Sequence, residues 1–194
     1  MKVFAEYSFE RYVFGSTNGK YSNPPDKNSL ELHVFVDGGG CGYGATVFLR
    51  FKDKDGYKMM RIFACSRVIG PNSSLSVPRR ELCSILLGIR KATAMAKDLE
   101  IPKENIFCHT DSLINMFWLK KNPGDLTVYV ANRVRQIQDY GIPIFYVDSF
   151  NNPSDNVSKV KNVKQYLDTD LWNHGPPYMS DPEWYVGRSI EEIR

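Results

Sequence analysis

The sequence predicts an α/β fold: a five-stranded mixed sheet whose first three strands are antiparallel, flanked by helices on both faces. Two observations carry this prediction. Residues 31–66 alternate apolar and polar side chains in strand-like runs, which are separated only by short turns. From residue 78 onward the apolar spacing changes to that of a helix, and helical and strand-like segments then alternate as far as residue 160. Strands on both sides of a helical crossover are typical of a mixed sheet covered by helices.

Three strands are predicted first, over 31–37 (ELHVFVD), 43–51 (YGATVFLRF) and 57–66 (YKMMRIFACS). The connections between them are short, and the second one, KDKDG, is a charged turn that ends in glycine. Strands joined in this way form an antiparallel meander.

A helix is predicted next, with Pro78 in its first turn and its end near Leu99, before Pro102. One face of this helix is defined by the spacing of Leu82, Ile85, Leu86, Ile89 and Thr93. The later predicted elements are a strand over 105–111, helices over 112–121 and 126–141, a strand over 142–149, and a last helix opened by 151–160. We expect the first and fourth strands to be parallel neighbours at the centre of the sheet.

The composition is that of one globular domain with arms. Of the 194 residues, 42% are hydrophobic and 24% are charged, which excludes a mainly disordered or fibrous chain. Residues 1–29, rich in Gly, Ser, Asn and Pro toward their end, are predicted to be an N-terminal arm and linker. The folded domain is predicted over 30–160, and an irregular C-terminal extension packed on it over 161–194.

Charge, cysteine spacing and hydropathy limit the setting. A net charge of +3 permits a polyanionic partner without requiring one. The four cysteines are far apart and form no CxxC pair, which argues against a zinc site and favours reduced thiols. No apolar run approaches the length of a membrane span, and the first residues lack the apolar core of a signal peptide. We therefore expect an intracellular protein of the cytoplasm or nucleus, with no membrane partner.

Four acidic residues stand where the predicted elements begin or end: Asp37, Glu81, Asp111 and Asp155. Each alone has a simpler explanation as a turn residue, a helix cap or a partner of the helix dipole. If the first and fourth strands are parallel neighbours, however, Asp37 and Asp111 emerge at the same edge of the sheet, where ligand sites form. Four converging carboxylates would repel one another unless divalent cations supplied the missing charge. Oxygen ligands of this kind suit Mg²⁺, and two such ions can promote phosphodiester hydrolysis.

Six segments around these carboxylates carry a family resemblance: VFVDGGGCGYGA (34–45), CSRVIGPNSSLSVPRREL (65–82), HTDS (109–112), YVANRV (129–134), NPSDNVSK (152–159) and LWNHGPPYM (171–179). In this order they resemble the ribonuclease H domain of BEL/Pao-type LTR retrotransposons, over residues 30 to about 185. That family has the ribonuclease H-like fold and an Asp-Glu-Asp-Asp metal site.

The resemblance implies a metal-dependent endoribonuclease that cleaves the RNA strand of RNA–DNA hybrids by two-metal hydrolysis. It implies that Asp37, Glu81, Asp111 and Asp155 are the catalytic metal ligands for two Mg²⁺ ions, with Mn²⁺ as a substitute, and that Asp37 is shared by both ions. The residues expected to bind substrate are Gly38, Gly39, Arg79, Ser112, Lys120, Lys121, Asn132 and Arg133. The glycines would let a nucleic-acid backbone come close, and the basic residues would contact phosphates.

The sequence also departs from the family pattern. Gly38 and Gly39 replace Ala-Ser, and YVDSF (146–150) lacks the histidine that often precedes the last aspartate and aids product release. Histidine His109, two residues before Asp111, is expected to be a packed strand residue.

Several alternatives stay open. Double-stranded RNA or another structured nucleic acid is an alternative substrate. The chain starts at Met1 with no reverse transcriptase or integrase segment, so it is either a domain excised from a retroelement polyprotein, with those segments as partners, or a domesticated gene with a host partner. A domesticated, weakly active or inactive module that binds nucleic acid or a protein is the alternative function. A 3′–5′ exonuclease is disfavoured. Those enzymes usually have Asp-x-Glu on the first strand, whereas Asp37 is followed by Gly38 and Gly39.

Overall fold

The computed structural model describes residues 16–17, 20–21, 29–70, 72–159, 170–189 and 192. Two short strands, β1 (Ser16–Thr17) and β2 (Lys20–Tyr21), pair antiparallel ahead of the main sheet. Most of the arm expected over 1–29, and the boundary expected at residue 160, lie outside the described residues. The division of the chain into arm, domain and extension therefore stays a prediction.

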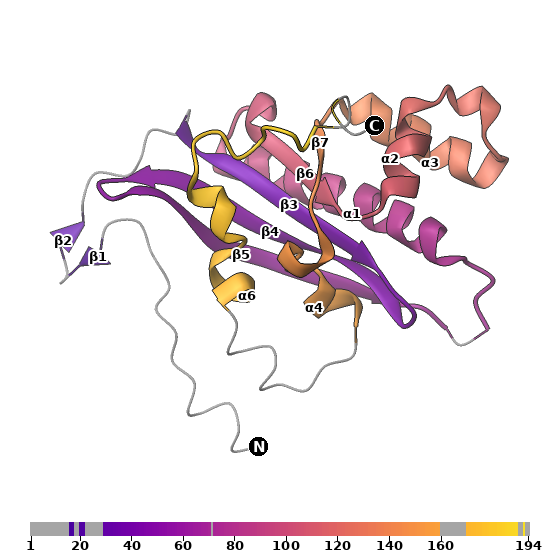
Figure 1. Ribbon diagram of the computed structural model, residues 1–194, viewed down its shortest axis with the longest axis horizontal. Helices are drawn as coiled ribbons and strands as arrows, with labels where there is room; N and C mark the ends of the chain where they lie inside the picture. Colours follow the sequence, from indigo (N-terminus) through magenta and orange to yellow (C-terminus); the bar gives the residue numbers. More distant parts are fainter. Residues whose placement is uncertain are drawn as a thin grey trace, which may run out of the picture.

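The main sheet has five strands in the order β5-β4-β3-β6-β7 (Figure 1). The first three, β3 (Glu31–Gly38), β4 (Gly42–Asp53) and β5 (Gly56–Val68), form the predicted antiparallel meander. Strand β6 (Ile106–Thr110) lies parallel to β3, and β7 (Ile144–Tyr146) lies parallel to β6. This confirms the predicted fold class and the central parallel pair.

Four helices follow the predicted order with changes of extent: α1 (Val77–Leu99), α2 (Leu113–Lys120), α3 (Val128–Tyr140) and α4 (Asp155–Ser158). A further short helix, α6 (Asp170–His174), lies in the segment that was expected to be irregular and was not predicted. Helix α1 has proline in its first turn and ends in a left-handed residue, Glu100, before Pro102. Helix α3 ends at Gly141, which takes the left-handed conformation at no steric cost.

The last predicted strand is shorter than the sequence suggests. Strand β7 starts only after Pro143, and the chain leaves the sheet beyond Tyr146 to form a 3₁₀ turn over Ser149–Asn151. Asp148 caps this turn by accepting from the backbone N–H of Asn151 at 3.1 Å. The turn matters because it leads directly into α4.

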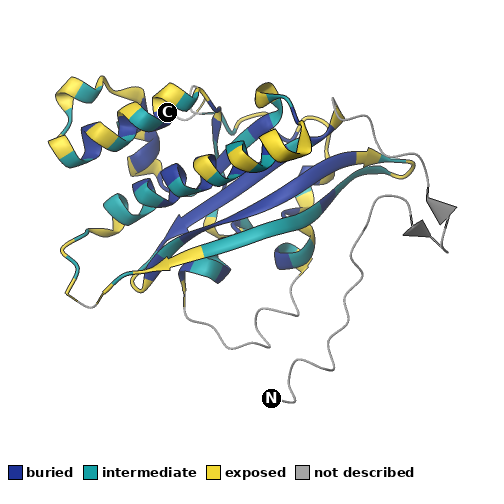
Figure 2. Ribbon diagram, turned by 180° about the vertical axis from the view of Figure 1, so that it is seen from behind, coloured by how far each residue is buried: buried dark blue, intermediate teal, exposed yellow. Residues whose placement is uncertain are grey.

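The sheet has two differently covered faces, which we name after the helices that pack on them. The α1 face is lined on β3 by Leu32, Val34 and Val36, and it carries α1 with α2 and α3 beyond it. The α4 face is lined on β3 by the alternate residues His33, Phe35 and Asp37, and it carries α4, α6 and the segment that follows. Figure 2 shows buried residues along the central strands and exposed residues on the outer sides of the helices.

The segment after α6 is tied to the α4 face by polar contacts. Arg50 of β4 donates from Nε to the carbonyl oxygen of Met179 at 2.8 Å and from Nη2 to that of Asp181 at 2.9 Å. Met179 and Trp184 of this segment are buried against Phe35 and other aromatic side chains. Among the described residues, no helix is both long enough and apolar enough to cross a membrane.

Candidate metal centre

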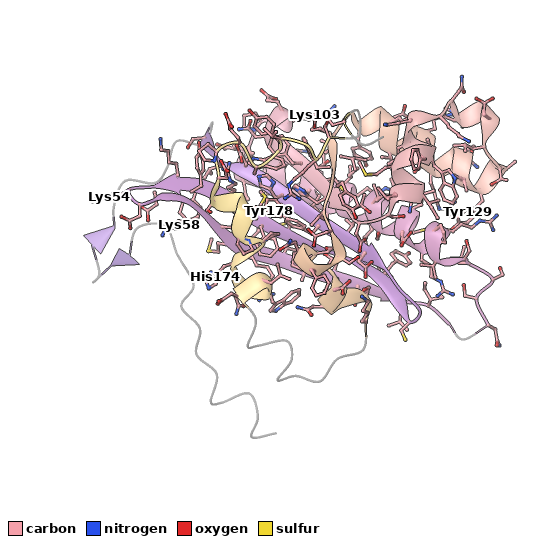
Figure 3. The ribbon with its side chains drawn as sticks, in the orientation of Figure 1. Lys54, Lys58, Lys103, Tyr129, His174 and Tyr178 are labelled. Carbon is pink, nitrogen blue, oxygen red and sulfur yellow. The ribbon has the colours of Figure 1, made fainter. Side chains whose placement is uncertain are left out.

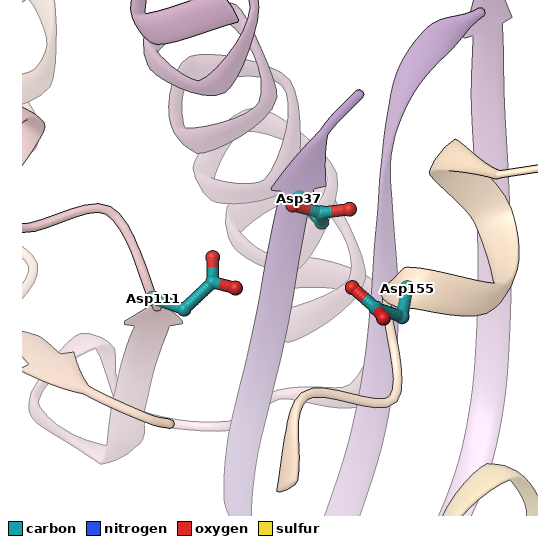
Figure 4. A group of neighbouring side chains, drawn as sticks. All are labelled: Asp37, Asp111 and Asp155. Carbon is teal, nitrogen blue, oxygen red and sulfur yellow. The ribbon is translucent and has the colours of Figure 1, made fainter. Parts of the chain in front are cut away.

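Three of the four predicted carboxylates meet at one edge of the sheet. Asp37 stands near the end of β3, Asp111 directly follows β6, and Asp155 begins α4. One carboxylate oxygen from each lies within 4.8 Å of the other two, and the side chains point into a common space (Figure 4). Asp37 is buried, and Asp111 and Asp155 are partly buried. We call this group the aspartate cluster.

The strand register brings Asp37 and Asp111 together. Strands β3 and β6 are parallel and pair Val36 with Thr110, so each aspartate follows the last paired residue of its strand. Because side chains alternate along a strand, both aspartates leave on the α4 face. The predicted convergence of two parallel strand ends is the physical reason that these residues, distant in sequence, lie side by side.

Asp155 is delivered to the same edge by a buried polar loop. The side-chain amide of Asn152 donates to the carbonyl oxygen of Val36 at 3.0 Å, and the Ser154 hydroxyl donates to that of Phe35 at 2.6 Å. Both residues are fully buried, and Ser154 also contacts the Thr46 hydroxyl at 3.1 Å. These bonds dock the start of α4 on β3, just before Asp37.

Each aspartate has one oxygen engaged by a neighbouring side chain. The Ser158 hydroxyl donates to Oδ2 of Asp37, and the Ser149 hydroxyl donates to Oδ2 of Asp111 at 2.7 Å. Lys159 Nζ lies 2.6 Å from Oδ2 of Asp155. The other oxygens of Asp111 and Asp155, both Oδ1, are buried and have no hydrogen-bond partner among the described residues.

The aspartate cluster carries more negative charge than the contacting cation, Lys159, can balance. The pKa of Asp37 is raised to about 6, first by burial and then by the charges of Asp111 and Asp155, against the lowering effect of the Ser158 hydroxyl. A bound cation would give the unpartnered carboxylate oxygens a ligand contact and would stabilise the ionised form of Asp37. The residues present therefore fit a divalent metal ion of the oxygen-binding class.

Glu81 does not belong to the aspartate cluster. It lies on α1, which packs on the opposite face of the sheet, and its Oε2 accepts from the Ser112 hydroxyl at 2.5 Å and from the Asn115 side-chain amide at 3.2 Å. Burial raises its pKa, and the charge of Asp111 raises it further. Glu81 is thus a neighbour of Asp111, and the Glu81 carboxylate is held by the first residues of α2 and its N-cap. Helix α1 starts at Val77, so Glu81 also lies beyond its first turn and is not the dipole partner that the sequence allowed.

The glycines after Asp37 have an intramolecular role. A Cβ on Gly38 would lie 2.5 Å from the backbone nitrogen of Glu81, and one on Gly39 would lie 3.3 Å from the carbonyl oxygen of Ser158. Arg80 Nη1 donates to the carbonyl oxygens of Gly39 and Gly40 at 3.0 and 2.9 Å. The missing side chains therefore let α1 and α4 approach the end of β3. Contact of Gly38 and Gly39 with substrate stays a prediction.

The other predicted substrate-binding residues lie on α1, α2 and α3. Two of them share one aromatic ring: the guanidinium of Arg133 lies 3.5 Å from the centre of the Tyr129 ring, and that of Arg79 lies 5.3 Å from it. Lys120, Lys121 and Asn132 are exposed, and Ser112 is the buried N-cap of α2. None of these residues is a member of the aspartate cluster.

Sequence reasoning missed the side chains that hold the carboxylates. Ser158 and Lys159 follow Asp155 by three and four residues, a spacing that places them on the same side of a helical turn. Asn115 follows Ser112 by the same helical spacing of three. The position of Ser149 carried no such signal, because it depends on where the chain leaves β7.

Comparison with known proteins gives a family. A family model described as "Pao retrotransposon-like RNaseH-like domain" matches residues 4–112, more than half of the chain, and this range includes Asp37, Glu81 and Asp111 but not Asp155. No curated protein matches the chain.

Solved structures of low sequence identity are similar to the chain. The N-terminal RNase H domain of rv2228c from Mycobacterium tuberculosis is 15% identical, with 66% of this chain and 91% of that chain covered and a TM-score of 0.49. RNase H1 from Halobacterium salinarum NRC-1 is 14% identical, with 66% and 92% covered and a TM-score of 0.40. The range matched by the family model includes the motifs around Asp37, Glu81 and Asp111. The chain belongs to the Pao retrotransposon-like family of RNase H-like domains.

Proposed function

We propose that this protein is a metal-dependent endoribonuclease that cleaves the RNA strand of RNA–DNA hybrids. The observation that carries the proposal is the aspartate cluster: three carboxylates at the ends of β3 and β6 and the start of α4 lie within 4.8 Å of one another. Two of them have a buried oxygen with no hydrogen-bond partner in the part of the chain that the structure describes. The cluster occurs in a domain of a family that is described as RNase H-like. Three carboxylates would repel the phosphates of a nucleic acid unless bound cations neutralised their charge.

Asp37, Asp111 and Asp155 would hold the metal, with Glu81 as a fourth ligand once its carboxylate is released from Ser112. Two Mg²⁺ ions, or Mn²⁺ in their place, would supply an activated water and stabilise the leaving oxygen of a phosphodiester. The chain's own contribution is orientation. Ser158 and Ser149 fix the rotamers of Asp37 and Asp111, and the loop bonded to Val36 and Phe35 fixes the start of α4.

Substrate binding would come from the basic residues of α1, α2 and α3. Arg79 and Arg133, gathered around Tyr129, and the exposed Lys120 and Lys121 supply the positive charge that a phosphate backbone requires. A duplex bound in this way is recognised by its shape and backbone rather than by its base sequence. An intracellular site of action stays a prediction.

Cleavage of a labelled hybrid tests the proposal. The full chain is incubated with an RNA–DNA hybrid and Mg²⁺, beside Asp37→Asn and the matched control Asp139→Asn, whose exposed side chain lies on α3. We expect wild type and Asp139→Asn to cleave the RNA strand, and Asp37→Asn to lose roughly a hundred- to a thousandfold or more in rate. Thermal unfolding provides the folding control, because neutralising Asp37 removes a disfavoured charge and should not lower stability. Equal rates for wild type and Asp37→Asn would contradict the proposal, as would no cleavage by the wild type.

A second function is favoured by one observation, the engagement of Glu81. A carboxylate held by Ser112 and Asn115 leaves only three ligands in the cluster, which is consistent with a weakly active or inactive module that binds nucleic acid or a protein partner. Fluorescence anisotropy with an uncleavable hybrid separates the two. Tight binding that is unchanged in Asp37→Asn, with no cleavage in Mg²⁺ or Mn²⁺, supports the binding module.

A further inference from the structure

One cation already lies against the aspartate cluster: the ammonium group of Lys159. It stands one residue after α4, with Nζ 2.6 Å from Oδ2 of Asp155, and its side chain is 50% exposed. Asp155 is 22% exposed in the same pair. The lysine is four residues after the aspartate, so one short helical turn carries both the acidic group and its partner.

The charge of Lys159 acts on all three aspartates rather than on Asp155 alone. Its Nζ is 2.6 Å from Oδ2 of Asp155, and one carboxylate oxygen of Asp155 lies within 4.8 Å of one oxygen each of Asp37 and Asp111. Charges at such separations in a partly buried site attract one another appreciably. The lysine is therefore placed to act as a counterion of the whole cluster.

A counterion in this position has a consequence for metal binding. A divalent ion in the cluster and the Lys159 ammonium would attract the same carboxylates and repel each other. The side chain of Lys159 is half exposed and flexible, so it can swing away into solvent when a stronger cation arrives. The lysine binds Oδ2 of Asp155, whereas the buried Oδ1 has no hydrogen-bond partner among the residues that the structure describes.

We propose that Lys159 is a tethered counterion of the aspartate cluster, which stabilises the metal-free fold and weakens the binding of divalent cations. This inference rests on the metal-binding part of the proposed function. Lys159 is thus a residue that tunes metal affinity. It sets how much free Mg²⁺ or Mn²⁺ the protein needs before its carboxylates are loaded.

Metal titration without any nucleic acid tests the inference. Binding of Mn²⁺ and of Mg²⁺ to the full chain is measured by calorimetry for wild type, Lys159→Met and Lys159→Arg. Thermal unfolding is followed with and without metal. Lys54→Met is the matched control, because Lys54 lies in the β4–β5 turn at the opposite end of the sheet from the cluster (Figure 3). It removes the same charge from an exposed site far from the carboxylates.

We expect Lys159→Met to bind Mn²⁺ and Mg²⁺ roughly three- to tenfold more tightly than wild type, a nearby-charge effect reduced by the exposure of the lysine. Without metal, the same variant should unfold at a lower temperature than wild type. Added metal should raise its unfolding temperature by more than it raises that of wild type. Lys159→Arg, which keeps the charge, and Lys54→Met should both match wild type. If Lys159→Met proves too unstable to titrate, Lys159→Gln provides the same loss of charge with a more polar side chain.

Different failures give different patterns. Equal metal affinity in wild type and Lys159→Met would overturn the counterion role and leave the nuclease proposal intact. Weaker binding in Lys159→Met would overturn it too, because the lysine would then be orienting Asp155 for the metal. Tighter binding in Lys159→Met together with no hybrid cleavage would support the counterion role while the nuclease proposal fails. No metal binding by either protein would overturn both.

Discussion

On the α1 face of the sheet, Leu32, Val34 and Val36 of β3 pack against the apolar side of α1. On the α4 face, the alternate residues of the same strand are His33, Phe35 and Asp37, and their neighbours include aromatic side chains as well as histidine, arginine, serine and asparagine. Both sets of side chains are buried almost completely. One strand thus contributes to two interiors. The first is apolar, and the second, which we call the polar interior, buries hydrogen-bonding groups among aromatic side chains and includes the aspartate cluster.

The polar interior contains a chain of hydrogen bonds that starts at a buried arginine. Arg50, 1% exposed, donates from Nη1 to Oε2 of Glu31 at 2.6 Å, and His33 Nε2 contacts the same oxygen at 3.0 Å. Burial raises the pKa of Glu31, but its bonds to His33 and Arg50 lower it below the ordinary value, so this carboxylate stays ionised. A carboxylate can only accept, so His33 donates from Nε2 and accepts at Nδ1.

The chain ends at a second histidine. His109 Nε2 lies 3.0 Å from Nδ1 of His33 and must donate to it. His109 Nδ1 is then an unprotonated nitrogen, buried and without a partner among the described residues. Its ring stacks on Phe35 at 4.4 Å between centres. Apolar packing on the α1 face has no such directional requirement. On the α4 face, the protonation and orientation of each hydrogen-bonding group are set by its neighbour.

The two faces of the sheet differ in how they tolerate substitution. On the α1 face, a substitution should lower the free energy of unfolding in proportion to the side-chain volume removed, and it should change no other property. On the α4 face a substitution that removes one polar partner leaves another buried and unsatisfied. The two faces can therefore be told apart by which property changes, and not only by how much.

The largest stability effect should come from Arg50→Met. This change removes donors to Glu31 and to the carbonyl oxygens of Met179 and Asp181, and it leaves all three acceptors buried or partly buried. We expect the free energy of unfolding to fall by about 3–5 kcal/mol, as for a buried ion pair that has lost one partner. Chemical denaturation measures it, and limited proteolysis should cut first within residues 175–189.

The matched control for Arg50→Met is Arg135→Met, an exposed position on α3, which should change stability by less than about 1 kcal/mol. Arg50→Lys should not restore the wild-type stability, because an ammonium group lacks the planar fork that reaches three acceptors. A loss below about 1 kcal/mol in Arg50→Met would show that the polar face is not held together by this residue.

The next effect should come from Ile89→Ala on the α1 face. Ile89 is fully buried on α1 within the apolar core, so its removal should lower the free energy of unfolding by roughly 2–5 kcal/mol. Metal affinity and the pH dependence of stability should stay as in wild type, because no polar group changes. Leu99→Ala, at a 41% exposed position of the same helix, is the control and should cost far less. A change in metal affinity in Ile89→Ala would break the separation of the two faces.

The α1 face was the part of the molecule that could be predicted well from the sequence. The spacing of Leu82, Ile85 and Ile89 predicted both the helix and the side that it buries, because hydrophobic periodicity is a local signal. The parallel pairing of β3 and β6 followed from the order of the elements. The same two inferences placed Asp37 and Asp111 at one edge of the sheet.

The polar face was harder to predict, because its contacts join residues far apart in sequence. His109 was expected to be a packed strand residue and is buried, but nothing in the sequence indicated that it would bond to His33, 76 positions earlier. The position of Glu81 depends on how α2 presents Ser112 and Asn115, which periodicity does not encode. Carboxylate positions could thus be predicted from the ends of elements, whereas the partners of each carboxylate could not.

The sharpest test of the polar interior is the dependence of stability on pH. Burial lowers the pKa of His33 and lowers that of His109 well below the ordinary value of 6.5. Above pH 6.5 both the folded and the unfolded chain hold these rings neutral, so the stability is fully present. Below it the unfolded chain binds protons that the folded chain does not, and each histidine lowers the free energy of unfolding by up to about 1.4 kcal/mol per pH unit. We expect stability to fall between pH 7 and pH 5 in urea titrations.

Asp37 opposes this trend, and that opposition can be measured. Its pKa is raised from 3.8 to about 6 in the fold, so its contribution is present below 3.8 and is lost as pH rises through 6. Asp37→Asn removes this opposing contribution, and the fall in stability below pH 6 should become steeper than in wild type. Ile89→Ala should lower the whole curve without changing its slope. A wild-type stability that stays flat between pH 7 and pH 5, in Asp37→Asn as well, would mean that His33 and His109 accept protons inside the fold, and the polar face would then be no more sensitive to pH than the apolar one.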